Sequence, residues 1–262
     1  PDSVNAIYGR AFYNCTNLSE INYPMSLSNA GEEIFANTKL TRMTVPEGVT
    51  KLADRVFKNC TNFIKIQLPA TLKSIGGSSL EGCTGLTELE LPEGLPSIGN
   101  WGMYNCTGLT ELELPDGITK LGRYSLANCS NLSKVNYPKS LNSTGEGIFN
   151  GDSKLKSITV PEGVETLPNN AFRDANYPTR ISLPMSLKVI ESSAFEGCST
   201  IERMILPENL TTIGSYAFCN CPALELIWVG EGVTSIHDRS FEGCSTAKLV
   251  FHGKAGSYAQ TW

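Results

Sequence analysis

The sequence predicts a solenoid: about eleven copies of a 23-residue unit, wound as a right-handed superhelix with a parallel β-sheet on its concave face. Three observations predict it. Prolines recur at constant spacing, apolar residues recur at fixed places after each proline, and each unit closes with alternating apolar and polar residues. The spacing is 23 residues except for one step of 22, and Pro1 and Gly230 extend the same phase. The prolines are Pro24, Pro46, Pro69, Pro92, Pro115, Pro138, Pro161, Pro184 and Pro207.

The closing segment of each unit is predicted to be the strand. In the unit that begins at Pro69, Leu89 and Leu91 alternate with Glu88 and Glu90. A period of two is typical of a strand with one buried face, so the leucines should point inward and the glutamates outward. Copies of this strand in register, about 4.8 Å apart, form a parallel sheet.

The proline after each strand ends strand pairing because it has no N–H, and Pro92–Gly94 reads Pro-Glu-Gly, a sequence that favours a turn. On the opposite side, segments such as Ser215–Phe218 are too short for more than one or two helical turns, so a short helix or 3₁₀ turn is expected on the convex side. With the proline as place zero, place 13 is usually Asn or Gly, which fits a left-handed cap. These residues are Asn14, Asn59, Gly82, Asn105, Asn128, Gly197, Asn220 and Gly243.

Composition argues against several functions. The net charge is −5, whereas a protein that binds nucleic acid through its phosphates is normally basic. Apolar runs such as Leu249–Phe251 are far shorter than a membrane span. The two histidines, His237 and His252, lie beside no nucleophile with an orienting acid, and Gly76-Gly77-Ser78 lacks the lysine of a phosphate loop. We predict no enzyme activity, no cofactor and no membrane span.

Taken together, the residues resemble the BspA-type (Treponema pallidum-type) leucine-rich repeat, over essentially the whole chain. The shared unit is L-P-x-x-L-x-x-I-G-x-x-A-F-x-x-C-x-x-L-x-x-L-x-L. The resemblance implies one leucine-rich repeat solenoid domain over residues 1–252, and a tail over residues 253–262 that resembles part of a C-terminal cap. It also implies a secreted or cell-surface bacterial protein that acts in adhesion and protein–protein interaction.

The sequence also repeats at a longer period, which spans about five copies of the 23-residue unit. Residues 17–35 match residues 131–149, and the copies that begin at Pro24 and Pro138 depart from the repeat at the same two places. The aliphatic residue of place 6 is replaced by Ala30 and Thr144, and the cysteine of place 14 by Thr38 and Asp152. The next copy also departs from the pattern. We therefore expect the array to be weakest or most irregular near residues 144–180.

Eight of the nine cysteines occupy place 14, so they should stack as a ladder. Zinc sites need converging ligand pairs, whereas Cys219-Asn-Cys221 is the one close pair, so no metal site is predicted. Buried, reduced cysteines are favoured over disulfides between neighbouring copies. Cys219, two places before the ladder, is expected to be exposed and reactive.

The outward strand residues are the candidate binding residues, because the repeat imposes nothing on them. Four carboxylates on adjacent strands should repel one another unless a cation, a basic partner or water alone stabilises them. A contiguous apolar stretch follows near the C-terminal end. Such a stretch marks an interface, or is covered by the tail or by a segment outside this chain. The two sets are Glu88, Glu90, Glu111 and Glu113, and Ile205, Leu226, Trp228, Leu249 and Phe251.

The sequence favours a non-enzymatic protein-binding or adhesion module that binds a protein or glycoprotein of a host or neighbouring cell through its concave face. An alternative is a spacer or targeting arm for an enzyme or anchor domain outside this chain. A carbohydrate-cleaving surface built on Glu88 and Glu111 is a third hypothesis, weakened because an open sheet offers no pocket to tune a carboxylate.

Overall fold

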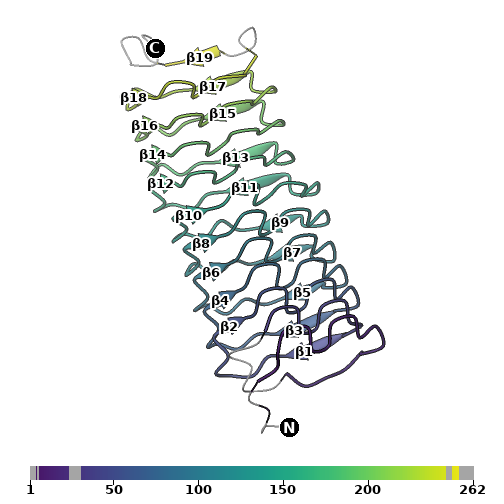
Figure 1. The fold of residues 1–262 in the computed structure, drawn as a ribbon. Helices are drawn as coiled ribbons and strands as arrows, with labels where there is room; N and C mark the ends of the chain where they lie inside the picture. Colours follow the sequence, from purple (N-terminus) through teal and green to yellow (C-terminus); the bar gives the residue numbers. More distant parts are fainter. Residues whose placement is uncertain (1–3, 5, 24–30, 246–249, 254–262) are drawn as a thin grey trace.

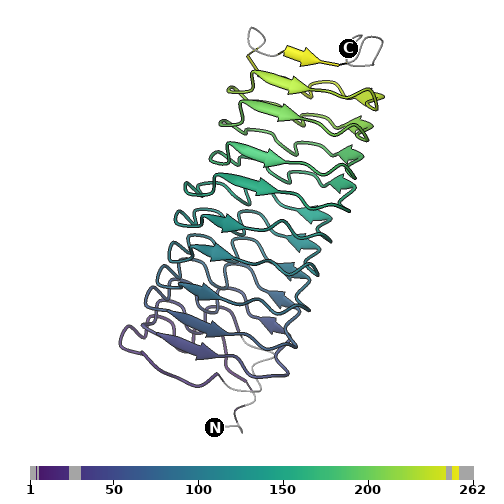
Figure 2. The same ribbon diagram turned by 180° about the vertical axis from the view of Figure 1, so that it is seen from behind.

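The chain winds into one stack of turns that carries two ladders of short parallel strands, seen from opposite sides in Figures 1 and 2. This computed structural model describes residues 4, 6–23, 31–245 and 250–253. The fold is the predicted parallel-strand solenoid with a repeat of about 23 residues. The number of eleven copies stays a prediction, because parts of the first two copies and of the last one lie outside the described residues.

The odd-numbered strands form the predicted wide sheet, but it is divided into four groups, because β5 does not pair with β7, β9 with β11 or β13 with β15. Their paired residues lie 23 apart up to β17, as Arg42 and Lys65 do, and the second residue of each strand through β17 is buried. The outward surface of these strands is called the strand face below. They are β1 (Arg42–Thr44), β3 (Lys65–Gln67), β5 (Glu88–Leu89), β7 (Glu111–Leu112), β9 (Lys134–Val135), β11 (Ser157–Thr159), β13 (Arg180–Ser182), β15 (Arg203–Ile205), β17 (Leu226–Trp228) and β19 (Val250–His252).

The even-numbered strands form a second, narrower ladder that sequence reasoning missed. Each has two residues, at places 5 and 6 of its copy, which is too short to show a period of two. They are β2 (Lys51–Leu52), β4 (Ser74–Ile75), β6 (Ser97–Ile98), β8 (Lys120–Leu121), β10 (Ser143–Thr144), β12 (Thr166–Leu167), β14 (Val189–Ile190), β16 (Thr212–Ile213) and β18 (Ser235–Ile236).

The prediction of a short helix or 3₁₀ turn on the side away from the strand face is wrong. The described residues on that side form turns and no helix. The left-handed conformation of place 13 is confirmed, as at Asn105 (φ 59°), and place 9 shares it, as at Trp101 (φ 53°). Because of this alternation, the N–H groups of Trp101, Met103 and Asn105 all donate to carbonyls of the next copy at 2.8–2.9 Å. A helix would have kept these hydrogen bonds within one copy.

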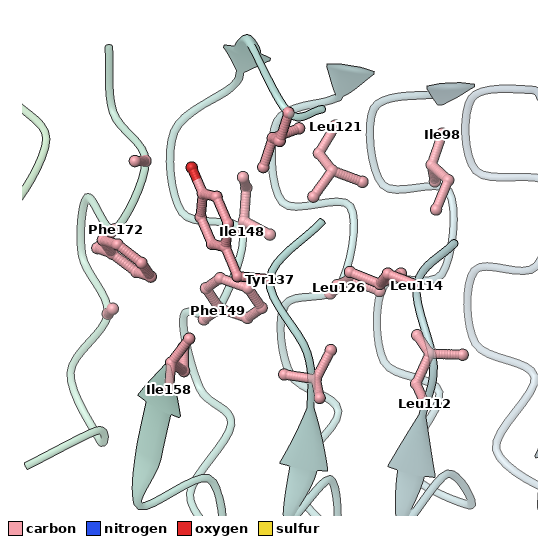
Figure 3. Close-up of a cluster of buried hydrophobic side chains, with 14 of the residues drawn as sticks. Ile98, Leu112, Leu114, Leu121, Leu126, Tyr137, Ile148, Phe149, Ile158 and Phe172 are labelled. Atoms are coloured by element: carbon pink, nitrogen blue, oxygen red, sulfur yellow. The ribbon is translucent and has the colours of Figure 1, made fainter. Parts of the chain in front are cut away.

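The core is a continuous column of apolar side chains enclosed by the turns. Phenylalanines of place 11 stack along it, with ring centroids 5.3 Å apart for Phe172 and Phe195 and 5.0 Å apart for Phe195 and Phe218. Figure 3 shows the middle of this column, where Tyr137 lies among Ile148, Phe149 and Phe172.

The cysteine ladder is free of disulfides and buried from Cys60 onward. Each buried thiol of the ladder donates to a carbonyl of the preceding copy, as Cys106 Sγ does to Leu80 O at 3.2 Å. Burial raises the pKa of the Cys83 and Cys106 thiols well above the usual value. The expectation for Cys219 is wrong, because Cys219 is buried. Cys15, at the same place of the first copy, is exposed instead.

The predicted irregularity near residues 144–180 is present. The narrow ladder is interrupted between β10 and β12. On the turn side, Gly147 N–H donates to Arg173 O at 3.2 Å, and within the described residues Phe149 and Gly151 do not make the bonds that their equivalents make in regular copies. Neighbouring copies are therefore joined by fewer backbone hydrogen bonds on the turn side and in the narrow ladder here than at the regular junctions among the described residues.

Candidate binding surface

The strand face exposes two side chains from each regular copy. The alternation along the strand turns the middle residue into the core and the flanking residues outward, as in Arg42–Thr44, where Met43 is buried. Parallel register then places equivalent residues of neighbouring copies side by side. Within each group of paired strands, a partner that lies along the face therefore contacts rows of side chains about 4.8 Å apart.

The four predicted carboxylates lie on β5 and β7 and on the residue that follows each, and all four are exposed. The structure places them on neighbouring copies whose strands, β5 and β7, do not pair, and two of them have basic neighbours. Lys65 Nζ lies 3.5 Å from Glu88 Oε2, and Lys134 Nζ lies 3.4 Å from Glu111 Oε2. No ion pair involves Glu90 or Glu113 within the described residues. Exposed pairs of this kind contribute little to stability, so the acidic surface remains available to solvent or to a partner.

The predicted apolar residues lie together only in part. Ile205 pairs in register with Trp228, and their side chains are 76% and 49% exposed, while Leu226 is half-buried. Leu249 lies outside the described residues. The predicted alignment of Phe251 with Trp228 is wrong by one residue, because the register sets Phe251 beside Ile227 and His252 beside Trp228. One extra residue in the last copy causes this shift, which no spacing of prolines could indicate after Pro207.

Sequence reasoning missed a basic neighbour of this apolar surface. Arg180 begins β13 and Arg203 begins β15, so both are outward residues of adjacent copies, and both are exposed. Met185, which follows the next proline, is 51% exposed and lines the same hollow. The signal was visible in the sequence, because two arginines 23 residues apart occupy one place of the repeat.

No group of three or more His, Cys, Asp or Glu side chains among the described residues could hold a metal ion. Glu88 lines a hollow of about 270 Å³ together with Lys65 and Glu90, and Glu111 lies beside Lys134. The described part of the chain also contains no helix able to cross a membrane.

The chain matches one protein family. A family model described as "BspA type Leucine rich repeat region (6 copies)" matches residues 1–81, 50–178 and 175–255. These ranges cover almost the entire sequence. No curated protein is similar enough to the chain to count as a match.

Solved structures show the same architecture. A leucine-rich repeat protein from Bacteroides ovatus is 25% identical with a TM-score of 0.67, over 95% of this chain and 59% of that protein. The T. pallidum leucine-rich repeat protein is 27% identical with a TM-score of 0.54, over 62% of this chain and 78% of that one. The pneumococcal vaccine antigen PcpA is 18% identical with a TM-score of 0.50, which indicates the fold alone. The chain therefore spans less than two thirds of the Bacteroides protein.

Proposed function

The chain belongs to the BspA-type leucine-rich repeat family, and we propose that it is a non-enzymatic adhesion module that binds a macromolecular partner through its strand face. The proposed partner is a protein or glycoprotein of a host or a neighbouring cell, and the proposed location is the surface of, or outside, a bacterial cell. The family resemblance supports this location.

One observation carries the proposal: the strand face leaves Ile205 and Trp228 side by side and exposed. Large apolar side chains that lie next to each other on a soluble surface typically mark an interface, and tryptophan is a favoured anchor because it buries a large area on binding. A hollow lined by Trp228, Glu208 and Glu231 adjoins this pair. A partner of ordinary interface size would bury about 800 Å² on this side.

A binding screen tests the proposal. The purified chain is presented to extracellular-matrix proteins, mucins and a glycan array, beside a Trp228→Ala/Glu111→Lys double variant. We expect a partner whose binding is lost in the variant, with a change of at least tenfold in Kd, since truncation of an anchor residue typically costs more than about 1.4 kcal/mol.

The matched control is Trp101→Ala. Trp101 is also exposed, but it lies on the turn side and stacks on Tyr124 with ring centroids 6.2 Å apart. Binding that survives this control and fails in the double variant places the partner on the strand face. Absence of any partner, with all three proteins folded, would instead support a spacer or targeting arm for a domain outside this chain.

A further inference from the structure

The last two cysteines of the ladder lie side by side in copies that are held in register. Cys221 and Cys244 both occupy place 14, and β16 and β18 of the same two copies pair residue for residue. One residue before Cys221, the Asn220 N–H donates to Glu242 O of the next copy at 2.7 Å. Backbones joined in this way run about 4.8 Å apart, and a disulfide spans Cα atoms about 4.4–6.8 Å apart. The backbone geometry therefore allows a disulfide between the two cysteines.

The Cys244 thiol already points into the copy that holds Cys221. Its Sγ donates to Phe218 O at 3.1 Å, three residues before Cys221 in the chain. When Cys244 ionises, the Cys221 S–H donates a hydrogen bond to it, which lowers the pKa of Cys244 although burial opposes this effect. The thiolate is the form of cysteine that attacks disulfides. Cys244 is thus the nucleophile of the pair, and Cys221 is the thiol next to it.

Access to solvent distinguishes this pair from the rest of the ladder. Cys244 is 7% exposed, the largest fraction among the buried ladder thiols. Cys15 is exposed at the opposite end of the stack, but place 14 of the next copy holds Thr38 and so offers it no second thiol. A small oxidant therefore reaches a neighbouring pair of ladder thiols first at Cys221 and Cys244. The ladder thiols with no exposed surface are Cys60, Cys83, Cys106, Cys129 and Cys198.

Cys219 is a third thiol nearby, but the register gives it other neighbours. It occupies place 12, and the residues at place 12 of the flanking copies are Glu196 and Glu242. Burial and these two carboxylates raise the pKa of Cys219. Cys221 shares place 14 with Cys244, whereas Cys219 lies two residues out of register with it. The register therefore favours Cys221 as the partner of Cys244.

We propose that Cys221 and Cys244 form a reversible disulfide that fastens the last copy of the ladder to the copy before it. The Cys244 thiolate attacks one sulfur of a small-molecule disulfide, forms a mixed disulfide with that half and releases the other half as a thiolate. This step removes the hydrogen bond that raises the pKa of Cys221. Cys221 then loses its proton to solvent, attacks the Cys244 sulfur and releases the second thiolate. The two protein thiols are oxidised, and the small disulfide is reduced to two thiols.

The new bond closes a loop of the chain that contains β17, β18 and Trp228. A closed loop has fewer opened conformations, so the last copy should separate from the stack less often. A thiol reductant reverses the bond and this effect. The inference is independent of the proposed function, because neither the bond nor its test involves a binding partner.

Oxidised glutathione is the probe that tests the inference. The folded chain is incubated with it, the remaining thiols are blocked with iodoacetamide under denaturing conditions, and mass spectrometry locates the disulfides in tryptic peptides. Trypsin separates Cys244, on residues 240–248, from Cys219 and Cys221, on residues 204–239. We expect these two peptides to be linked in the unmodified sequence. Hydrogen exchange in β18 should become at least about tenfold slower after oxidation and should recover with dithiothreitol.

Cys219→Ser is the matched control, and it should keep the link. Cys221→Ser should lose the link and retain glutathione on Cys244, while Cys15 carries glutathione in every variant and so reports that the reagent is active. The unmodified sequence and Cys219→Ser decide the result even if Cys221→Ser fails to fold.

Three results would overturn the inference. They are glutathione on Cys15 with no link at Cys244, a link that disappears in Cys219→Ser, and linkage of Cys60 to Cys83 at the same rate. A link that leaves hydrogen exchange in β18 unchanged would show that the bond does not fasten the last copy.

Discussion

Asp152 occupies the place that cysteine holds in most copies, and it is fully buried. Its Oδ1 accepts a hydrogen bond from Cys129 N–H at 2.8 Å, while Oδ2 has no partner among the described residues. Burial raises the pKa of the Asp152 carboxyl well above its usual range, although the bond from Cys129 N–H lowers it somewhat. A cysteine at this place donates its proton to a carbonyl, as Cys106 does, whereas an ionised carboxylate has no proton to donate.

We predict that Asp152→Cys stabilises the protein at pH 8 and does so less at pH 4. With a raised folded pKa, the native state holds the proton more tightly than the unfolded state. Asp152 therefore destabilises the folded protein least at pH values below the pKa that its carboxyl has in the unfolded chain. As pH rises from that value toward the raised pKa of the folded protein, the stability of the protein falls. The expected gain at pH 8 is about 1–3 kcal/mol, the usual cost of an unsatisfied buried polar group, measured by denaturant unfolding.

The control for this prediction is Thr38→Cys, at the same place of the other five-copy block. Thr38 Oγ1 already donates to Phe35 O at 2.8 Å, and threonine carries no titrating group, so its change in stability should not vary between pH 4 and 8. A gain for Asp152→Cys that is equally independent of pH would contradict the role given to the carboxylate.

At the scale of elements, we predict that two departures from the repeat compensate for each other. Thr144 of β10 replaces the aliphatic residue that faces the core in other copies, as Leu121 does in β8. Tyr137, at the end of the preceding copy, is larger than the leucine or valine of most copies and is buried near Ile148 and Phe149 (Figure 3). Tyr137 and Phe172 have ring centroids 5.6 Å apart. We therefore predict that the aromatic ring of Tyr137 fills space that the shorter side chain of Thr144 leaves in the core.

A double-mutant cycle tests this compensation. Tyr137→Leu alone should destabilise the array by about 2–4 kcal/mol, because it opens a cavity beside Phe172. Thr144→Ile alone should destabilise the array by about 1–3 kcal/mol, because it overpacks the core and removes the hydrogen bond from Thr144 Oγ1 to Asn169 O. The double variant has the residue types of the regular copies at both places. We therefore expect its loss of stability to be smaller than the sum of the losses in the two single variants. Additive losses in urea unfolding would show that the two residues fill separate spaces.

At the scale of the whole molecule, each copy contacts chiefly its two neighbours, so stability depends on every junction between copies. Regular junctions have the narrow ladder and the turn-side bonds of Trp101, Met103 and Asn105 to the next copy. The junction near residues 144–180 lacks the β10–β12 pairing and most of the turn-side bonds. Such a junction divides the stack into two segments, on either side of the missing bonds.

We predict that amide hydrogens of Phe149 and Gly151 exchange faster than those of Met103 and Asn105, which donate to the next copy at 2.9 Å. Hydrogen exchange with mass spectrometry on the folded chain measures this, with peptides that cover residues 146–152 and 100–106. Equal protection of the two peptides would mean that the stack opens as one cooperative unit.

The sequence by itself determined the solenoid, the period, the wide sheet and the outward rows of residues. These follow from a pattern repeated many times, so that chance departures in one copy do not hide it. Only the tertiary structure decided the narrow ladder and the turns of the opposite side, because hydrogen bonds between copies impose them and no single copy contains them. The same holds for the register of β19 and for the hollow at Arg180 and Arg203. Both depend on which residues of neighbouring copies lie side by side, which local sequence patterns do not specify.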